Sequence, residues 1–198
     1  MHKKKIIGWL ALLVLVTSLS AQETAPNYFP LQIGTRWTYS VKDQKEMVSL
    51  VAVREEKVGE QLCVRIELRI KDSTASTEHI AVLRDGIYRF KVDENIIGPP
   101  VCFMKSPAKK GEKWTNTFKI KDKEGKVTYS TDAEDVEVGA GKFKGALVVI
   151  GETIENGIPV KMKNWYAADV GMVKQVIEAG KDLTILELEK VERVEMKK

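Results

Sequence analysis

The sequence is poor in the side chains that most enzymes and metal proteins use. It contains two histidines and two cysteines, and one of these histidines is His2, near the start. The other, His79, has no cysteine beside it and does not supply the usual ligand set for zinc or for mononuclear iron. The nucleophile elbow G-x-S-x-G, the P-loop and the dinucleotide motif G-x-G-x-x-G are absent as well. We therefore expect no metal and no cofactor.

An excess of charge of one sign is also missing. The chain has 32 basic and 28 acidic residues, and three of the lysines, Lys3 to Lys5, lie in the N-terminal segment. The 29 basic and 28 acidic residues that remain nearly cancel, and the two signs are interspersed. A protein that binds nucleic acid normally concentrates positive charge on one face. Nucleic acid is therefore not an expected partner.

Long apolar runs are confined to the N-terminus. Three lysines precede the apolar run Ile6–Val16, and small polar residues follow it. This pattern is typical of a secretory signal peptide, because eleven apolar residues are too few to span a bilayer as a helix. We predict a signal peptide over residues 1–21, a flexible leader over 22–27 and a single antiparallel β domain over 28–198. The mature chain has no expected transmembrane segment and is periplasmic or secreted.

The mature sequence is dominated by alternation of apolar and polar residues with period two, which is typical of β-strands. The segments 36–41, 87–92 and 113–120 each place their larger side chains on one face: Trp37, Tyr39 and Val41; Tyr88, Phe90 and Val92; Trp114, Asn116, Phe118 and Ile120. Asp85-Gly86 and Asn156-Gly157 are typical of tight antiparallel hairpins. The sequence predicts an all-β fold made of a single curved antiparallel sheet, a half-barrel or open barrel, with a β-sandwich as the alternative.

One motif occurs twice. Residues 30–38 and 107–115 both read Pro, three residues, Gly, two residues, Trp-Thr, at a separation of 77 residues. Proline ends the preceding element, and glycine permits a sharp turn into a strand that carries the tryptophan inward. The repeat suggests two similar sheet halves. The tryptophans either fill a core or line a ligand cavity, and the sequence leaves both interpretations open.

Two cysteines, Cys63 and Cys102, would reach an oxidising compartment after export, where a disulfide is permitted. Cys63 lies on the polar face of its predicted strand, opposite Val64 and Ile66. Whether Cys102 lies beside it depends on strand pairing, so the bond stays open.

Several blocks resemble those of a group of uncharacterised exported bacterial β-rich proteins that carry a Pro-Leu-x-x-Gly-x-x-Trp-Thr-Tyr motif. The blocks are YFPLQIGTRWTYSV, RDGIYRF, KKGEKWTNTF, VEVGAGKFKGALVV and NWYAADVGMVKQ, and they span Tyr28 to Gln175. The fold that this resemblance implies is similar to the half-barrel of lipoprotein-carrier proteins, which has an apolar concave face. The present sequence departs from the carriers in showing no helices to fill that concavity. The resemblance implies no activity and no catalytic residues.

Three functions remain. The first is an exported binding module that holds an apolar or lipid-like ligand in the concave face of its sheet, with Trp37, Tyr39, Trp114, Phe118 and Trp165 as candidate ligand-binding residues. The second is a structural or interaction protein of the cell envelope, with a protein partner and no small ligand. The third is a carboxylate-dependent hydrolase using the acidic run at 132–137. We favour the first and expect a chain without catalytic residues, because neighbours on one strand alternate faces and a solvated acidic edge explains the run.

Overall fold

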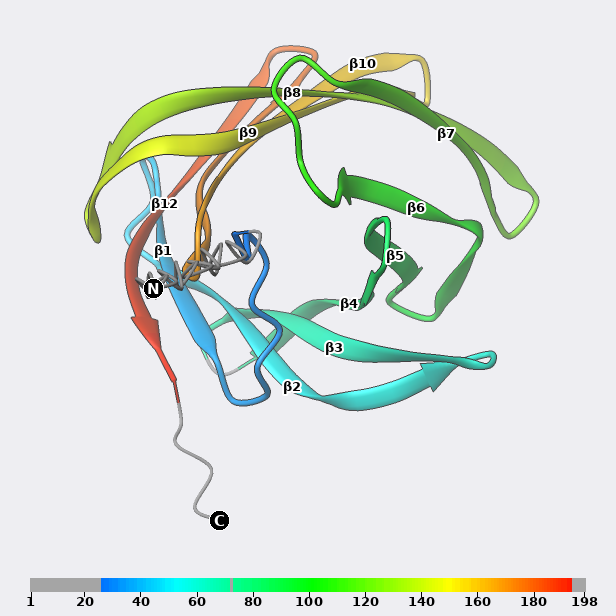
Figure 1. Cartoon of the computed structure of the whole chain (residues 1–198), viewed down its shortest axis with the longest axis horizontal. Helices are drawn as coiled ribbons and strands as arrows, with labels where there is room; N and C mark the ends of the chain where they lie inside the picture. The colour runs from blue at the N-terminus through cyan, green and yellow to red at the C-terminus, as the bar shows by residue number, and fades with distance from the viewer. Residues whose placement is uncertain (1–25, 72, 194–198) are drawn as a thin grey trace, which may run out of the picture.

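The computed structural model describes residues 26–71 and 73–193, so the predicted signal peptide and most of the leader lie outside the described residues. Twelve strands follow one another along the chain (Figure 1). They are β1 (Arg36–Val41), β2 (Val48–Val58), β3 (Gln61–Ile70), β4 (Ser73–Leu83), β5 (Gly86–Val92), β6 (Asn95–Lys105), β7 (Lys113–Ile120), β8 (Lys123–Val138), β9 (Gly141–Glu155), β10 (Ile158–Ala167), β11 (Gly171–Ala179) and β12 (Asp182–Glu192). No helix among these residues has the length and apolar character needed to cross a membrane.

The strands form a closed barrel in which each pairs with its neighbours in sequence and β12 returns to pair with β1. The all-β antiparallel class is therefore confirmed, whereas the half-barrel or open barrel and the alternative β-sandwich are wrong. Closure comes from β1, which pairs with β2 along one side and with β12 along the other. In a closed sheet each strand has a partner on both sides over at least part of its length.

The turns divide between two ends of the barrel. Because the strands alternate in direction, the turns after β1, β3, β5, β7, β9 and β11 lie at one end, which we call the mouth. The segment 26–35 enters β1 at the opposite end, which we call the base. In Figure 1 this segment, in dark blue, lies within the outline of the barrel.

The predicted strand faces are correct in β1 and β7 and wrong in β5. Trp37, Tyr39 and Val41 are all buried, and exposed and less exposed residues alternate throughout β7. In β5, however, the pairing with β6 shifts register between Ile87 and Tyr88 and again between Arg89 and Lys91. These irregularities break the simple alternation, so that Arg89 faces the interior of the barrel.

The duplicated motif builds the same structure twice. Gly34 and Gly111 both adopt positive φ angles, 86° and 79°. Each donates its N–H to the second strand of its half, to the Ala52 oxygen at 2.8 Å and the Thr131 oxygen at 2.9 Å respectively. The next residue in each copy accepts a hydrogen bond in return from that same strand residue. The barrel therefore consists of two halves of six strands, β1–β6 and β7–β12, each opened by the same turn.

One junction between these halves is weak. β6 and β7 share only two register pairs, Ile97 with Ile120 and Gly98 with Lys119, whereas β1 and β12 share six. Pro99 and Pro100 follow immediately in β6, and proline has no N–H to continue the ladder. We call this junction the seam.

Candidate functional site

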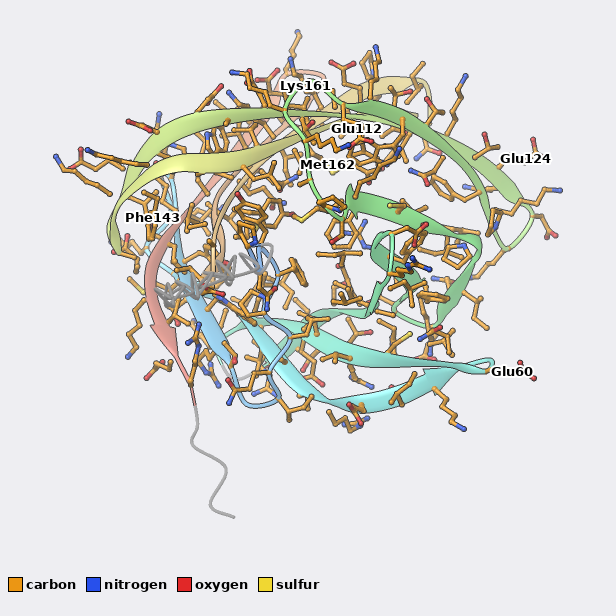
Figure 2. All side chains as sticks on the ribbon, viewed as in Figure 1. Glu60, Glu112, Glu124, Phe143, Lys161 and Met162 are labelled. Carbon is orange, nitrogen blue, oxygen red and sulfur yellow. The ribbon has the colours of Figure 1, made fainter. Side chains whose placement is uncertain are left out.

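The interior of the barrel holds a cavity of about 410 Å³, which is within the usual range for ligand sites. Its wall is mostly apolar and draws on strands from all around the barrel. Figure 2 shows side chains reaching inward from the strands, and the labelled Met162 is one that lines the cavity. The lining residues with apolar or sulfur-containing side chains are Phe29, Val41, Val48, Leu50, Ile66, Leu68, Ile80, Phe103, Val149, Met162, Met172, Ile177 and Leu186, together with the rings of Tyr129 and Tyr166.

The N-terminal segment closes the base of the cavity. Phe29 lines it, and its ring meets Phe103 edge-on at 5.5 Å between centroids and Tyr166 at 6.0 Å. The segment is held by its backbone, because the Asp169 N–H donates to the Asn27 oxygen at 2.8 Å. An aromatic plug of this kind leaves the other end of the barrel as the route into the cavity.

The mouth is open, and exposed apolar side chains lie near it. Gln44 and Thr184, which line the cavity at this end, are both exposed. Large apolar side chains that face solvent gather near the strand ends here, in residues Met47, Ile70, Ile96, Ile154, Ile158 and Leu183, which are 40–71% exposed. Exposed charged residues, such as Glu46 and Lys181, lie in the same turns, so the mouth carries both apolar and charged side chains.

Among the described residues that line the cavity, Glu78 and Arg89 are the charged ones, and they pair with each other. The Arg89 Nε lies 3.1 Å from the Glu78 Oε2, but its N–H is not directed at an acceptor, and Nε is buried without a hydrogen bond. The guanidinium also lies 5.3 Å from the centre of the Phe103 ring. Burial alone would lower the pKa of Arg89, but the Glu78 carboxylate outweighs it and raises the pKa, so the side chain is a cation.

The wall also contains uncharged polar groups. Tyr129 and Tyr166 line the cavity, and burial raises the pKa of both phenols, so their hydroxyls stay protonated and can donate. Asn164 and Gln175 also line it and are joined by a hydrogen bond of 2.7 Å from the Gln175 amide. The site is thus an apolar chamber with a hydrogen-bonding patch in its wall.

Two of the predicted ligand-binding residues lie near the base of this chamber. Trp37 and Tyr39 line a much smaller void, of about 20 Å³, beside the main cavity. The Trp37 indole donates to the Val170 oxygen at 2.6 Å, and the Tyr39 hydroxyl donates to the Met172 oxygen at 2.9 Å. Both side chains therefore anchor β1 to the start of β11 as well as walling the void.

The other three lie away from the cavity surface. Trp114 stacks on Tyr129 with 5.5 Å between ring centres, so it supports a residue of the wall. Phe118 lies over Gly125, where a Cβ would come within 2.5 Å of its ring. Trp165 lies between Asn164 and Tyr166, which both line the cavity, and points to the other face of β10, where its indole donates to Glu134 at 3.0 Å.

Trp114 has a second role at the seam. Its indole N–H donates to the Cys102 oxygen at 2.8 Å, and the Asn116 amide donates to the same oxygen at 3.0 Å. The Cys102 N–H in turn donates to the Asn116 Oδ1 at 3.1 Å. Side chains of β7 therefore bond to the backbone of β6 beyond the prolines, where backbone pairing has stopped.

The two cysteines are separate in the structure. Cys63 lies in β3 and Cys102 in β6, with two strands between them, and both are buried free thiols. Neighbouring strands are about 4.8 Å apart, so this separation is well beyond the reach of a disulfide. Burial raises the pKa of each thiol.

The carboxylates of the acidic run lie on the outer surface, where they form ion pairs and hydrogen bonds. Asp132 pairs with Lys110 at 2.8 Å, and Glu134 pairs with Lys163 at 2.8 Å. Asp135 accepts the Gly145 N–H at 2.8 Å. None of these residues lines the cavity, and no group of three or more His, Cys, Asp or Glu side chains within 26–71 and 73–193 is placed to hold a metal ion. The run is therefore a solvated, ion-paired part of the outer surface.

Sequence reasoning missed the polar part of the site. Glu78, Arg89 and Asn164 lie at interior positions, and interior polar residues interrupt the alternation from which the apolar face was predicted. One signal was present: Ile80 and Glu78 share a face, so a carboxylate had to accompany the apolar residues of β4.

Comparison with known proteins supports the fold and no more. No family model matches the chain, and no curated protein matches its sequence. A predicted lipoprotein from Parabacteroides distasonis ATCC 8503 is similar in structure, with a TM-score of 0.50 and 12% identity over 86% of this chain and all of that one. A predicted exported protein with a YmcC-like fold from Bacteroides fragilis NCTC 9343 aligns with a TM-score of 0.49 and 14% identity over 85% of this chain and all of that one.

Proposed function

We propose that this chain is an exported binding protein that holds a single-chain apolar or amphipathic ligand inside its barrel. The observation that carries the proposal is the cavity of about 410 Å³, apolar over most of its wall, plugged at the base and open at the mouth. Export is inferred from the basic and apolar N-terminal sequence.

The size of the cavity limits the ligand. If each carbon-sized group occupies roughly 30 Å³, similar to a water molecule in the liquid, the 410 Å³ chamber holds on the order of a dozen such groups. This volume fits one chain of medium length.

The first test is native mass spectrometry of the mature protein exported from its own host without delipidation. Extra mass that is lost on denaturation and recovered in an organic extract would establish a carried ligand and its class. A clean apo mass would favour the alternative, an envelope protein that binds a protein partner and no small ligand.

A matched pair of variants at the mouth localises the binding. Thr184 lines the cavity, and its neighbour Leu183 is 58% exposed and is not among the lining residues. Thr184→Phe places a ring in the entrance and should weaken binding of decan-1-ol at least tenfold in calorimetric titration. Leu183→Phe places the same ring on the neighbouring residue, which does not line the cavity, and should leave binding unchanged. Equal binding by both variants would contradict the interior site.

A further inference from the structure

The charge of the cavity is the feature from which a ligand class follows. Glu78 and Arg89 are the charged side chains among the described residues that line it, so their formal charges cancel. They retain 35% and 27% exposure, and because both line the cavity a ligand there can reach them. The pair is therefore available for binding and is not sealed within the packed core.

Each member of the pair has hydrogen-bonding capacity to spare. The Arg89 Nε is buried beside the Glu78 carboxylate at 3.1 Å, so a ligand would bond to the four N–H groups on the Nη1 and Nη2 atoms at the end of the guanidinium. A carboxylate accepts and never donates when ionised, and a guanidinium donates and never accepts. A group that both accepts from Arg89 and donates to Glu78 would satisfy both.

We infer that the cavity selects amphiphiles whose head group is uncharged and both donates and accepts hydrogen bonds, such as a hydroxyl or an amide, and discriminates against carboxylate and ammonium head groups. This inference rests on the proposed function. A charged head would bring an unbalanced charge into an apolar chamber whose own charges already cancel, and an uncompensated buried charge is costly. A hydroxyl brings no charge.

The remaining polar groups of the wall agree with this selection. The hydroxyls of Tyr129 and Tyr166 and the amides of Asn164 and Gln175 are uncharged groups that can donate and accept. They add hydrogen-bonding partners for a neutral head and supply no second cation for an anionic one.

The test compares three ligands with the same ten-carbon chain: decan-1-ol, decanoate and decylamine, the last protonated at pH 7. Isothermal titration of the full mature protein should show decan-1-ol binding at least tenfold more tightly than either charged ligand. Glu78→Gln leaves Arg89 as the one charged lining residue, so decanoate should gain at least tenfold and overtake decylamine. Glu124→Gln is the control, because Glu124 is an exposed residue outside the cavity, labelled in Figure 2, and should change nothing.

The outcomes separate the two proposals. Equal affinities for the three heads in the wild type, or no gain of decanoate in a folded Glu78→Gln protein, would overturn the inference while leaving the binding function intact. Failure of all three chains to bind the folded wild type would overturn the proposed function itself. Should Glu78→Gln not fold, Arg89→Gln tests the same logic with the opposite sign, since decylamine should then gain and decanoate should not.

Discussion

The seam between β6 and β7 allows a sharp test of how this barrel stays closed. Backbone pairing there stops at Gly98 and Lys119, and the Asn116 side chain takes its place by bonding to both the N–H and the oxygen of Cys102, at 3.1 and 3.0 Å. Asn116→Ala removes both hydrogen bonds in one substitution. It leaves the buried Cys102 N–H without its partner.

The expected cost follows from these contacts. Each hydrogen bond contributes about 1 kcal/mol net, and an unpaired buried donor costs about 1–3 kcal/mol, so we expect a loss of about 2–4 kcal/mol in the free energy of unfolding. For a domain of this size that is a fall of roughly 4–16 °C in Tm. Thr117→Ala is the matched control: Thr117 is the next residue, is exposed on the opposite face, and should change stability by less than about 0.5 kcal/mol.

The assay combines urea unfolding, followed by tryptophan fluorescence, with amide hydrogen exchange. If the seam opens locally, amides of β6 should exchange faster in Asn116→Ala than in wild type, while those of β11 should not change beyond the global loss of stability. A variant within 0.5 kcal/mol of wild type, with unchanged exchange in β6, would refute the role given to Asn116.

Two further predictions concern the motif tryptophans and an ion pair on the outer face. Trp37→Ala and Trp114→Ala should each weaken ligand binding by more than their loss of stability explains, because Trp37 walls the void beside the cavity and Trp114 supports Tyr129; undiminished binding by folded variants in the decan-1-ol titration would contradict this. Burial alone would raise the pKa of Glu67, but hydrogen bonds from Arg69 and Thr74 lower this pKa below its ordinary value of 4.5. The ionised Glu67 carboxylate therefore stabilises the fold above pH 4.5, and this stabilisation is lost as the pH falls through the lowered pKa of the folded state. Urea titrations should therefore show Glu67→Gln about 1–3 kcal/mol less stable than wild type at pH 7 and progressively closer to it towards pH 3; a constant difference would argue against this pairing.

Local sequence pattern predicted the strands well where the strand itself carries no bulge, as in β1, whose irregular pairing with β12 places the extra residue in β12. Alternation in β1 and β7 identified the inward residues, from Trp37 and Tyr39 to Trp114 and Phe118, because each strand contributes one uninterrupted face. The same reasoning failed in β5, because register shifts on both sides of Arg89 reverse the parity of the alternation. A bulge leaves no reliable mark in a single sequence, and plain alternation puts Arg89 on the face opposite Tyr88 and Phe90.

Closure was beyond the reach of local pattern for a different reason. It depends on the pairing of β1 with β12, whose residues Arg36 and Glu192 are at opposite ends of the chain, and on the number and tilt of the strands between them. Neither property can be predicted from the sequence of any one segment. The polar part of the cavity could not be predicted for the same reason, because Glu78 and Arg89 come together only when β4 and β5 pair within the closed barrel.

The two copies of the duplicated motif have different structural roles. In both copies a positive-φ glycine starts a strand and bonds it to the next strand of its half. In the first copy, the strand that precedes β1 around the barrel is β12, which contains no proline and pairs with β1 through six residue pairs. No side-chain bond is needed to hold these two strands together, and the Trp37 indole bonds to the Val170 oxygen. In the second copy the neighbour is β6, where Pro99 and Pro100 end the ladder, and the Trp114 indole bonds to that strand in its place. The motif thus supplies an indole N–H in each half of the barrel. In the first half it bonds to the backbone near the base, and in the second it bonds across the seam.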